Sequence, residues 1–206
     1  MTGKIKLNAA SGGGSVSFQA PSSTGDDRVI TLPTTADGTV LTTTNPKSGN
    51  IIQVVQTYKT DVFSSTPGQY TWVDVTGLSA SITTTGSNKV KVTTQVNVSV
   101  AHDGHNVYFK VLRGSTDIGL GDALGSTTRT SGNGHWTQGD GTSDYEAVGL
   151  TTQILDSPSA GTHTYKIQLL TNYNSTVIYA GRSQHNTITG FQACPAGFIT
   201  LEEVAA

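Results

Sequence analysis

Two histidines around an Asp-Gly pair are the first residues whose spacing suggests chemistry. His102 and His105 flank Asp103-Gly104, and Asp-Gly is typical of a two-residue hairpin turn. In such a hairpin the two histidines face each other with Cβ atoms about 5 Å apart, so two imidazoles and Asp103 could bind a metal ion. A closed site needs further ligands, and the sequence places none nearby. We favour polar residues at a loop tip, and we predict no cofactor.

Paired carboxylates would be needed to cleave a glycan. Asp140, Asp144 and Glu146 stand near Trp136 and are the best candidates. Most other aspartates occur in turn contexts, where Asp forms local backbone hydrogen bonds. The sequence contains no G-x-S-x-G, H-E-x-x-H or phosphate-loop motif. We therefore expect a protein that is not an enzyme, with a glycan depolymerase as the minor alternative.

Three polar and aromatic segments are candidates for ligand binding. The first is the pair His135-Trp136 within a loop rich in Gly, Ser and Thr. A Trp in such a loop can stack on a sugar ring or anchor an interface, or it can fold back as a lid over the end of a sandwich. The other two segments carry amide and aromatic side chains, or are ordinary loops. The predicted receptor- or glycan-binding residues are His135, Trp136, Asn172, Tyr173, Asn174, Arg182 and His185.

Charge and cysteine content argue against several classes of function. The net charge of −2 gives no basic surface for nucleic acid. Cys194 is the only cysteine, so no internal disulfide can form, and we expect its side chain to be buried. No run approaches the roughly 20 apolar residues of a membrane helix, and the first residues lack the apolar segment of a secretion signal. We expect synthesis in a cytoplasm, no binding of nucleic acid and no membrane insertion.

The composition predicts that strands and turns position these residues. Charged residues make up only 13% of the chain, against about 25% in ordinary domains, and no segment shows sustained helical periodicity. The clearest strand runs over 89–102, with Val90, Val92, Thr94, Val96, Val98 and Val100 on one face. We expect the strand at 107–113 to pair with it, with Val107, Phe109 and Val111 on its buried face.

Further strand patterns recur at 51–57, 70–75, 145–155, 165–169, 177–180 and 198–204. Turn signals separate them, which predicts an all-β, antiparallel β-sandwich head, most simply a jelly roll. Tyr70 and Trp72 are expected on one face of their strand, where they are good candidates for an interface between subunits.

Residues 1–44 differ from the rest of the chain. Their short strands end at Gly or Pro and carry too few large side chains to bury a core. We expect a short β stalk intertwined with other copies in a homotrimer, with a disordered Gly/Ser arm as the alternative. Residues 45–50 are a predicted linker, and 51–206 form the head. The candidate trimer-interface residues are Val16, Phe18, Ile30, Leu32, Val40, Leu41, Tyr70 and Trp72.

Several phrases of the chain are distinctive. The head contains Y-T-W-V-D-V-T-G-L-S-A-S-I-T (70–83), N-K-V-K-V (88–92), F-K-V-L-R-G-S-T-D-I-G-L-G-D (109–122), L-D-S-P (155–158) and T-Y-K-I-Q-L (164–169). Before it stand V-S-F-Q-A-P (16–21), I-T-L-P (30–33) and D-G-T-V-L (37–41). These phrases resemble the tail-fibre-like proteins of marine bacteriophages, including cyanophages.

The resemblance implies a homotrimeric virion appendage, made in the host cytoplasm. Its N-terminal segment would attach to other virion proteins, and its jelly-roll head loops would recognise a host cell-surface glycan or protein. The head is also broadly similar to the trimeric complement-C1q and tumour-necrosis-factor class, a likeness of fold alone. The chain is short for a tail fibre, so a capsid decoration or head-fibre protein without a receptor role stays open.

Overall fold

The computed structural model describes residues 4–8, 10–19, 25, 46–101, 105–135, 147–184 and 193–206. The chain divides into two compact units, Met1–Val40 and Leu41–Ala206. In the described ranges every regular element is a β-strand, and all strand pairs are antiparallel. The same ranges contain no helix of the length and hydrophobicity needed to span a membrane. The all-β, antiparallel prediction is confirmed.

The N-terminal unit contains a β-hairpin with one apolar face. Strand β1 (Lys4–Asn8) pairs with β2 (Ser15–Gln19), and the register sets Ile5 opposite Phe18 and Leu7 opposite Val16. Opposed residues of an antiparallel pair project to the same side, as do residues two apart in a strand. All four side chains are exposed within this chain, by 48% to 67%. A two-stranded hairpin is marginally stable by itself, so this apolar face favours a covering partner.

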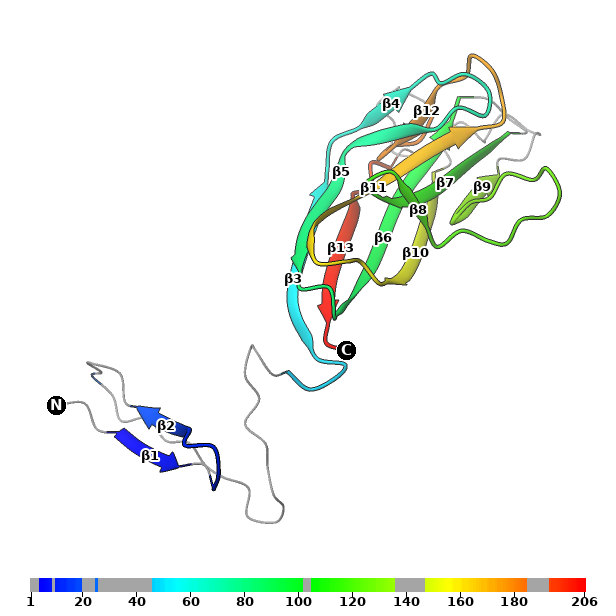
Figure 1. The fold of residues 1–206 in the computed structure, drawn as a ribbon. Helices are drawn as coiled ribbons and strands as arrows, with labels where there is room; N and C mark the ends of the chain where they lie inside the picture. Colours follow the sequence, from blue (N-terminus) through cyan, green and yellow to red (C-terminus); the bar gives the residue numbers. More distant parts are fainter. Residues whose placement is uncertain are drawn as a thin grey trace, which may run out of the picture. The chain divides into compact units, whose positions relative to one another are not determined.

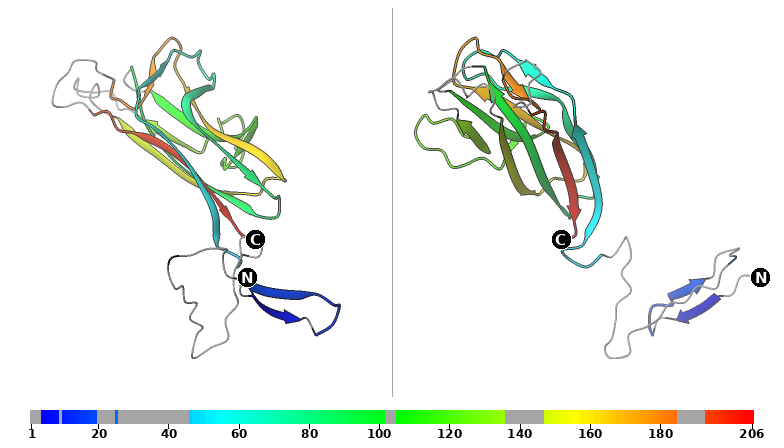
Figure 2. Two further views of the ribbon diagram at one scale, coloured as in Figure 1. Left: turned by 90° about the vertical axis from the view of Figure 1, so that its left-hand side faces the viewer. Right: turned by 180° about the vertical axis from the view of Figure 1, so that it is seen from behind.

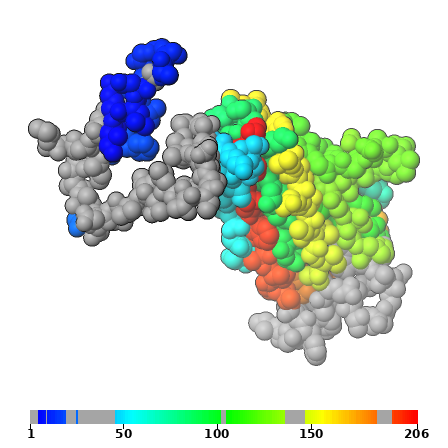
Figure 3. Space-filling model, turned by 90° about the horizontal axis from the view of Figure 1, so that it is seen from below, coloured from blue at the N-terminus to red at the C-terminus, as the bar shows by residue number. Residues whose placement is uncertain are grey.

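The first sheet of the head has six strands. Strands β3 (Ile51–Lys59), β13 (Gly197–Val204) and β6 (Lys89–Val100) lie side by side, and β10 (Val148–Asp156) pairs with the opposite edge of β6. These four strands form adjacent stripes in Figure 3. The short strand β12 (Ile178–Ala180) continues along β6 beyond β13, and β4 (Phe63–Ser65) lies outside it.

The second sheet has five strands and packs against the first. Its order is β5 (Val73–Thr84), β11 (Gly161–Thr171) and β7 (Asn106–Arg113). The two short strands β8 (Thr116–Ile118) and β9 (Gly132–His135) both pair with the remaining edge of β7. The two sheets lie face to face, which the views of Figures 1 and 2 show from different sides. The predicted sandwich is therefore confirmed.

The core lies between the sheets, on the faces that the alternation of the sequence predicts. In β6 the whole even-numbered face from Val90 to Val100 is buried, Thr94 included. The apolar faces of β7 and β11 meet it from the other sheet, and each fully buried Val, Leu or Phe contributes about 1.5–3 kcal/mol. The buried residues that confirm the predicted faces are Val90, Val92, Thr94, Val96, Val98, Val100, Val107, Phe109, Val111, Tyr165, Ile167 and Leu169.

The expected pairing of the strands 89–102 and 107–113 is wrong. Strand β6 belongs to the six-stranded sheet and β7 to the five-stranded sheet, so the chain passes from one layer to the other between them. Alternation shows which face of a strand is buried, but it does not show which strand lies beside it. The argument that set His102 opposite His105 across a hairpin therefore fails. His102 and Asp103 themselves lie outside the described residues.

A partly buried polar network joins the sheets at one side of the core. The Asp156 carboxylate of β10 accepts a hydrogen bond from the Tyr165 hydroxyl (2.7 Å) and pairs with the Arg113 guanidinium (2.6 Å). Tyr165 and Arg113 belong to the other sheet, on β11 and β7. Burial raises the pKa of Tyr165, and its hydrogen bond to Asp156 adds to the rise.

The chain enters the head beside its own C-terminus. The Gly49 amide donates to the Ala205 carbonyl, and the Ala205 amide donates to the Asn50 carbonyl, both over 2.9 Å. In Figure 1 the C-terminus and the start of β3 lie at one end of the sandwich, while the β4–β5 and β11–β12 connections lie at the opposite end. We call that opposite end the distal end.

Candidate ligand-binding site

A groove of about 400 Å³ lies on the outer side of the five-stranded sheet. Its lining consists of Tyr70, Tyr108, Ser126, Thr127 and Thr128. Tyr108 points outward from β7, because its neighbours Val107 and Phe109 are buried in the core. Tyr70 comes from the β4–β5 connection, and residues 126–128 come from the β8–β9 connection. Three segments distant in sequence therefore form the groove.

The backbone of Tyr70 is left-handed, with φ of 58°. For a residue with a Cβ this conformation costs about 1–2 kcal/mol, so the surrounding contacts must hold it. The Tyr70 amide donates to the Thr171 carbonyl (3.0 Å), and the Thr71 amide closes the turn onto the Gly68 carbonyl (3.0 Å). The Gln69 side chain donates to the Asn172 carbonyl (2.8 Å). These contacts fix a tyrosine that remains 56% exposed.

This turn corrects the strand expected at 70–75. Strand β5 begins at Val73, so Tyr70 and Trp72 do not alternate along an extended segment. Aromatic residues favour strands, but the long-range hydrogen bond from its amide to the Thr171 carbonyl holds Tyr70 in the turn. Trp72 lies near Lys110, whose Nζ atom is 4.6 Å from the ring centroid. The assignment of Tyr70 and Trp72 to a trimer interface stays a prediction.

The described lining of the groove consists of tyrosine, serine and threonine side chains. Burial is the main reason that the pKa of Tyr108 is raised, and the neighbouring Tyr70 adds to the rise. The ammonium of Lys110, two residues further along β7, pairs with the Asp117 carboxylate at 2.8 Å. Among the residues that the structure describes, the groove thus offers two phenol rings and three aliphatic hydroxyls, and neither a carboxylate nor a cation belongs to this described lining.

Three of the predicted binding residues lie in one cluster near the distal end. His135 Nδ1 is 3.0 Å from the Asn106 side-chain oxygen, and the Asn106 amide donates to the Asn172 side-chain oxygen over 2.8 Å. Tyr173 stacks on His105, with ring centroids 4.1 Å apart. Asn106 and Tyr108 point to the same side of β7, and Asn172 also binds Gln69 beside Tyr70. Hydrogen bonds therefore connect His135 and Asn172 to the wall of the groove.

The other predicted binding residues lie apart from this cluster or outside the described residues. Asn174 is exposed in the turn that follows Tyr173. Arg182 follows β12 of the six-stranded sheet, where its guanidinium lies 4.5 Å from the Tyr179 ring centroid and donates to the Ser183 and Gln184 carbonyls. The candidates outside the described residues are Trp136, His185, Asp103, Asp140, Asp144, Glu146, Ile30, Leu32, Val40 and Leu41.

The expected burial of Cys194 is wrong, because its thiol is exposed. It belongs to the segment before β13 rather than to a core strand. Within the described ranges, no three His, Cys, Asp or Glu side chains lie close enough together to bind a metal ion.

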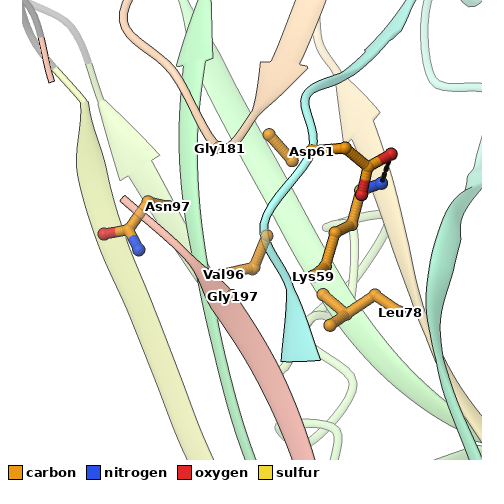
Figure 4. Close-up of a pocket in the computed structure, with 8 residues that line it drawn as sticks. Lys59, Asp61, Leu78, Val96, Asn97, Gly181 and Gly197 are labelled. Carbon is orange, nitrogen blue, oxygen red and sulfur yellow. Dashed lines mark hydrogen bonds and ion pairs between the residues drawn. The ribbon is translucent and has the colours of Figure 1, made fainter. Parts of the chain in front are cut away.

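A second hollow lies between the six-stranded sheet and Leu78 of β5, and it is far smaller. Lys59, Leu78, Val96 and Gly197 help to line a cavity of about 10 Å³, which is room for one water molecule. Lys59 is 7% exposed, and its ammonium pairs with Asp61 at 2.9 Å (Figure 4). This hydrogen bond is the main reason that the pKa of Asp61 is lowered. The cavity is too small for an organic ligand.

The sequence analysis identified only some of the residues that line the groove. Tyr70 was expected at an interface, whereas Tyr108 and residues 126–128 were not singled out. Tyr108 had one available signal, since it is an aromatic residue on the polar face of a predicted strand. The hydroxyl residues 126–128 have no distinguishing pattern within a loop rich in Gly, Ser and Thr.

Comparisons with known proteins give no family for this chain. No protein-family model and no curated protein sequence matches it. Two solved structures, of the Gt and Gx strains of infectious bursal disease virus, are similar with TM-scores of 0.42 and 0.41 at 12% and 13% identity. The alignments cover 94% and 93% of this chain, which spans about half of each matched chain (48% and 46%).

Proposed function

We propose that the protein is a subunit of a homotrimeric virion fibre whose head recognises the host cell surface. The jelly-roll head expected for such a fibre is supported by the order of the strands. When the four short strands are left aside, β3, β5, β6, β7, β10, β11 and β13 alternate between the two sheets in chain order, an order that fits the Greek-key connections of a double-sheet jelly roll. The phage-fibre phrases of the sequence support the same class.

The observation that carries the proposal is the separation of the two ends of the head. The N-terminal connection enters beside Ala205, and the cluster of His135, Asn172 and Tyr173 lies toward the distal end. A head attached through its N-terminal segment would present these distal connections to a partner. Connections on a rigid β-scaffold are a common place for recognition.

Exposed apolar surface supports the self-association. The hairpin face of Ile5, Leu7, Val16 and Phe18 is exposed, by 48% to 67%. On the outer side of β3, Val54 and Tyr58 are 58% and 62% exposed, and the Tyr58 ring centroid lies 5.9 Å from that of Phe198 on β13. In the proposed trimer, the hairpin faces of three copies cover one another, and the N-terminal unit also attaches to other virion proteins.

The proposed role is non-enzymatic. The described lining of the groove consists of phenols and hydroxyls, whereas glycoside hydrolysis requires paired carboxylates. A depolymerase would produce halos when purified protein is applied to host lawns, and we expect none. Halos that vanished on mutation of Asp140, Asp144 or Glu146 would contradict the non-enzymatic role.

Light scattering and cell binding test the proposal on full-length protein. We expect a mass of about three times the 21.4 kDa of one chain, and we expect labelled protein to coat host cells and to compete with virions for adsorption. A monomeric mass would overturn the trimer, and a trimer that leaves adsorption unchanged would overturn the receptor role.

A capsid decoration or head fibre is the second candidate. The observation in its favour is the small size of the N-terminal unit, whose described strands form a single hairpin. A reconstruction of the intact virion separates the candidates, because a receptor-binding head lies on the tail or at a projecting tip.

A further inference from the structure

The groove between Tyr70 and Tyr108 has the size and the lining of a small-ligand site. Its volume of about 400 Å³ lies within the roughly 300–1,000 Å³ of ligand pockets. One wall is an aromatic side chain on a strand, the second is an aromatic side chain on a braced turn, and the third is a row of hydroxyls.

The hydroxyl wall is also braced. The Thr127 amide and hydroxyl both donate to the Leu124 carbonyl, over 3.1 and 2.7 Å. Arg129 Nε donates to the Gly121 carbonyl over 2.7 Å, and the Gly121 amide donates to the Thr130 carbonyl over 3.3 Å. Internal hydrogen bonds therefore hold the connection that carries residues 126–128 in place. A prearranged wall loses less conformational entropy when a ligand binds.

The left-handed Tyr70 is the second, independent observation. A glycine would adopt φ of 58° without steric cost, yet the chain places a large aromatic residue there and leaves 56% of it exposed. Strain of this kind concentrates at functional sites, where the surrounding structure holds it. Neither burial in the core nor the left-handed turn calls for an aromatic ring at this position, and contact with a ligand in the groove would account for it.

The lining selects the chemistry of the ligand. An acidic ligand would need a cation, but the nearby Lys110 is paired with Asp117 and packed on Trp72. A basic ligand would need a carboxylate, and the described part of the chain contributes none to the lining. Phenol rings accept the apolar face of a sugar ring, while hydroxyls exchange hydrogen bonds with sugar hydroxyls.

We propose that this groove binds a neutral glycan, with Tyr70 stacked on a sugar ring and Ser126, Thr127 and Thr128 hydrogen-bonded to its hydroxyls. This inference rests on the proposed receptor role and names the substrate class that the head recognises. It replaces the trimer interface as the role of Tyr70, and it adds Tyr108 to the binding residues.

The test uses full-length protein on an array of neutral and acidic oligosaccharides, followed by titration with the best neutral one. We expect binding to neutral glycans and a loss of affinity of about tenfold or more in Tyr70→Gly, as for other aromatic anchors. Tyr70→Gly is the informative variant because glycine removes the ring while it suits the left-handed backbone, so the fold is kept. Tyr70→Phe, which keeps the ring, should retain most of the affinity.

Leu124→Ala is the matched control, since Leu124 belongs to the same connection, is 76% exposed and does not line the groove. Its affinity should equal that of the wild type. Binding to acidic glycans alone, no binding to any glycan, or equal binding by Tyr70→Gly and wild type would each overturn the inference.

Coating of host cells separates this inference from the proposed function. If wild-type protein and Tyr70→Gly coat host cells equally, the head recognises the host elsewhere, and only the groove assignment fails. If neither coats host cells, the receptor role itself fails.

Discussion

Replacing Thr94 by Val should stabilise the head, because Thr94 carries a buried hydroxyl without a partner. Thr94 is 0% exposed on the inner face of β6, among Val92, Val96 and Val98. Its hydroxyl oxygen has no hydrogen-bond partner among the described residues. Across the ladder it stands opposite Thr152 of β10 and Ile199 of β13.

The magnitude follows from the missing hydrogen bond. A buried, unsatisfied hydroxyl costs about 1–3 kcal/mol, and Val replaces it with a methyl group on the same β-branched frame. Allowing for the slightly larger methyl group, we expect the free energy of unfolding to rise by about 1–2 kcal/mol. For a chain of this length each kcal/mol raises the melting temperature by about 2–4 °C.

The assay is thermal and urea unfolding of full-length protein at one fixed concentration, because assembly makes the apparent stability concentration-dependent. Thr94→Ser is the matched control: it keeps the hydroxyl, loses a buried methyl, and should destabilise the head by about 1 kcal/mol. If Thr94→Val is neutral or destabilising, the hydroxyl has a partner in solution, and the reasoning is refuted.

Three further predictions concern titration, packing and assembly. Because the pKa of Tyr165 is raised, its contribution to stability is complete below the unfolded pKa of about 10 and is lost as the pH rises above that value. In urea unfolding, the wild type should therefore lose its stability advantage over Tyr165→Phe from about pH 10 upward. A stability difference that stays constant with pH would contradict this. Gly119→Ala brings a Cβ against the Ile154 side chain and should cost about 1–3 kcal/mol more in urea unfolding than Gly114→Ala, which has a similar positive φ but open space. Equal losses would show that Ile154 moves aside. Phe18→Ser should lower the trimer fraction in light scattering, whereas Ser17→Ala on the opposite hairpin face should not; an unchanged trimer would remove this face from the interface.

The sequence predicts which residues of a strand are buried, because alternate residues point to opposite faces and the apolar set marks the buried face. The even-numbered residues of 90–100 and the alternation of Tyr165, Ile167 and Leu169 identify the core faces without knowledge of the neighbouring strands. Strand partners were not predictable in the same way. Both edges of β6 are occupied by strands remote in sequence, while an Asp-Gly pair suggested a local hairpin.

The candidate site was only partly predictable, because it combines short and irregular elements. Strands β4, β8 and β9 have three or four residues, too few to show periodicity. The left-handed turn at Tyr70 depends on a bond to Thr171 about a hundred residues away in sequence. His135 and Asn172 were identified by residue type, but only the fold brings them together through Asn106.

If the head has the proposed receptor role, the distribution of charge favours recognition by shape and hydrogen bonding. Cations of both sheets are engaged locally in the pairs Lys59–Asp61, Lys91–Glu202, Lys110–Asp117, Arg113–Asp156 and Lys166–Asp74. Opposite charges a few ångströms apart largely cancel at longer range, so a head of this kind provides little electrostatic steering. A neutral surface of phenols, amides and hydroxyls gains selectivity from stacking and matched hydrogen bonds instead. That balance would suit the proposed homotrimeric virion fibre, because weak contacts made by several heads at once add up to firm attachment.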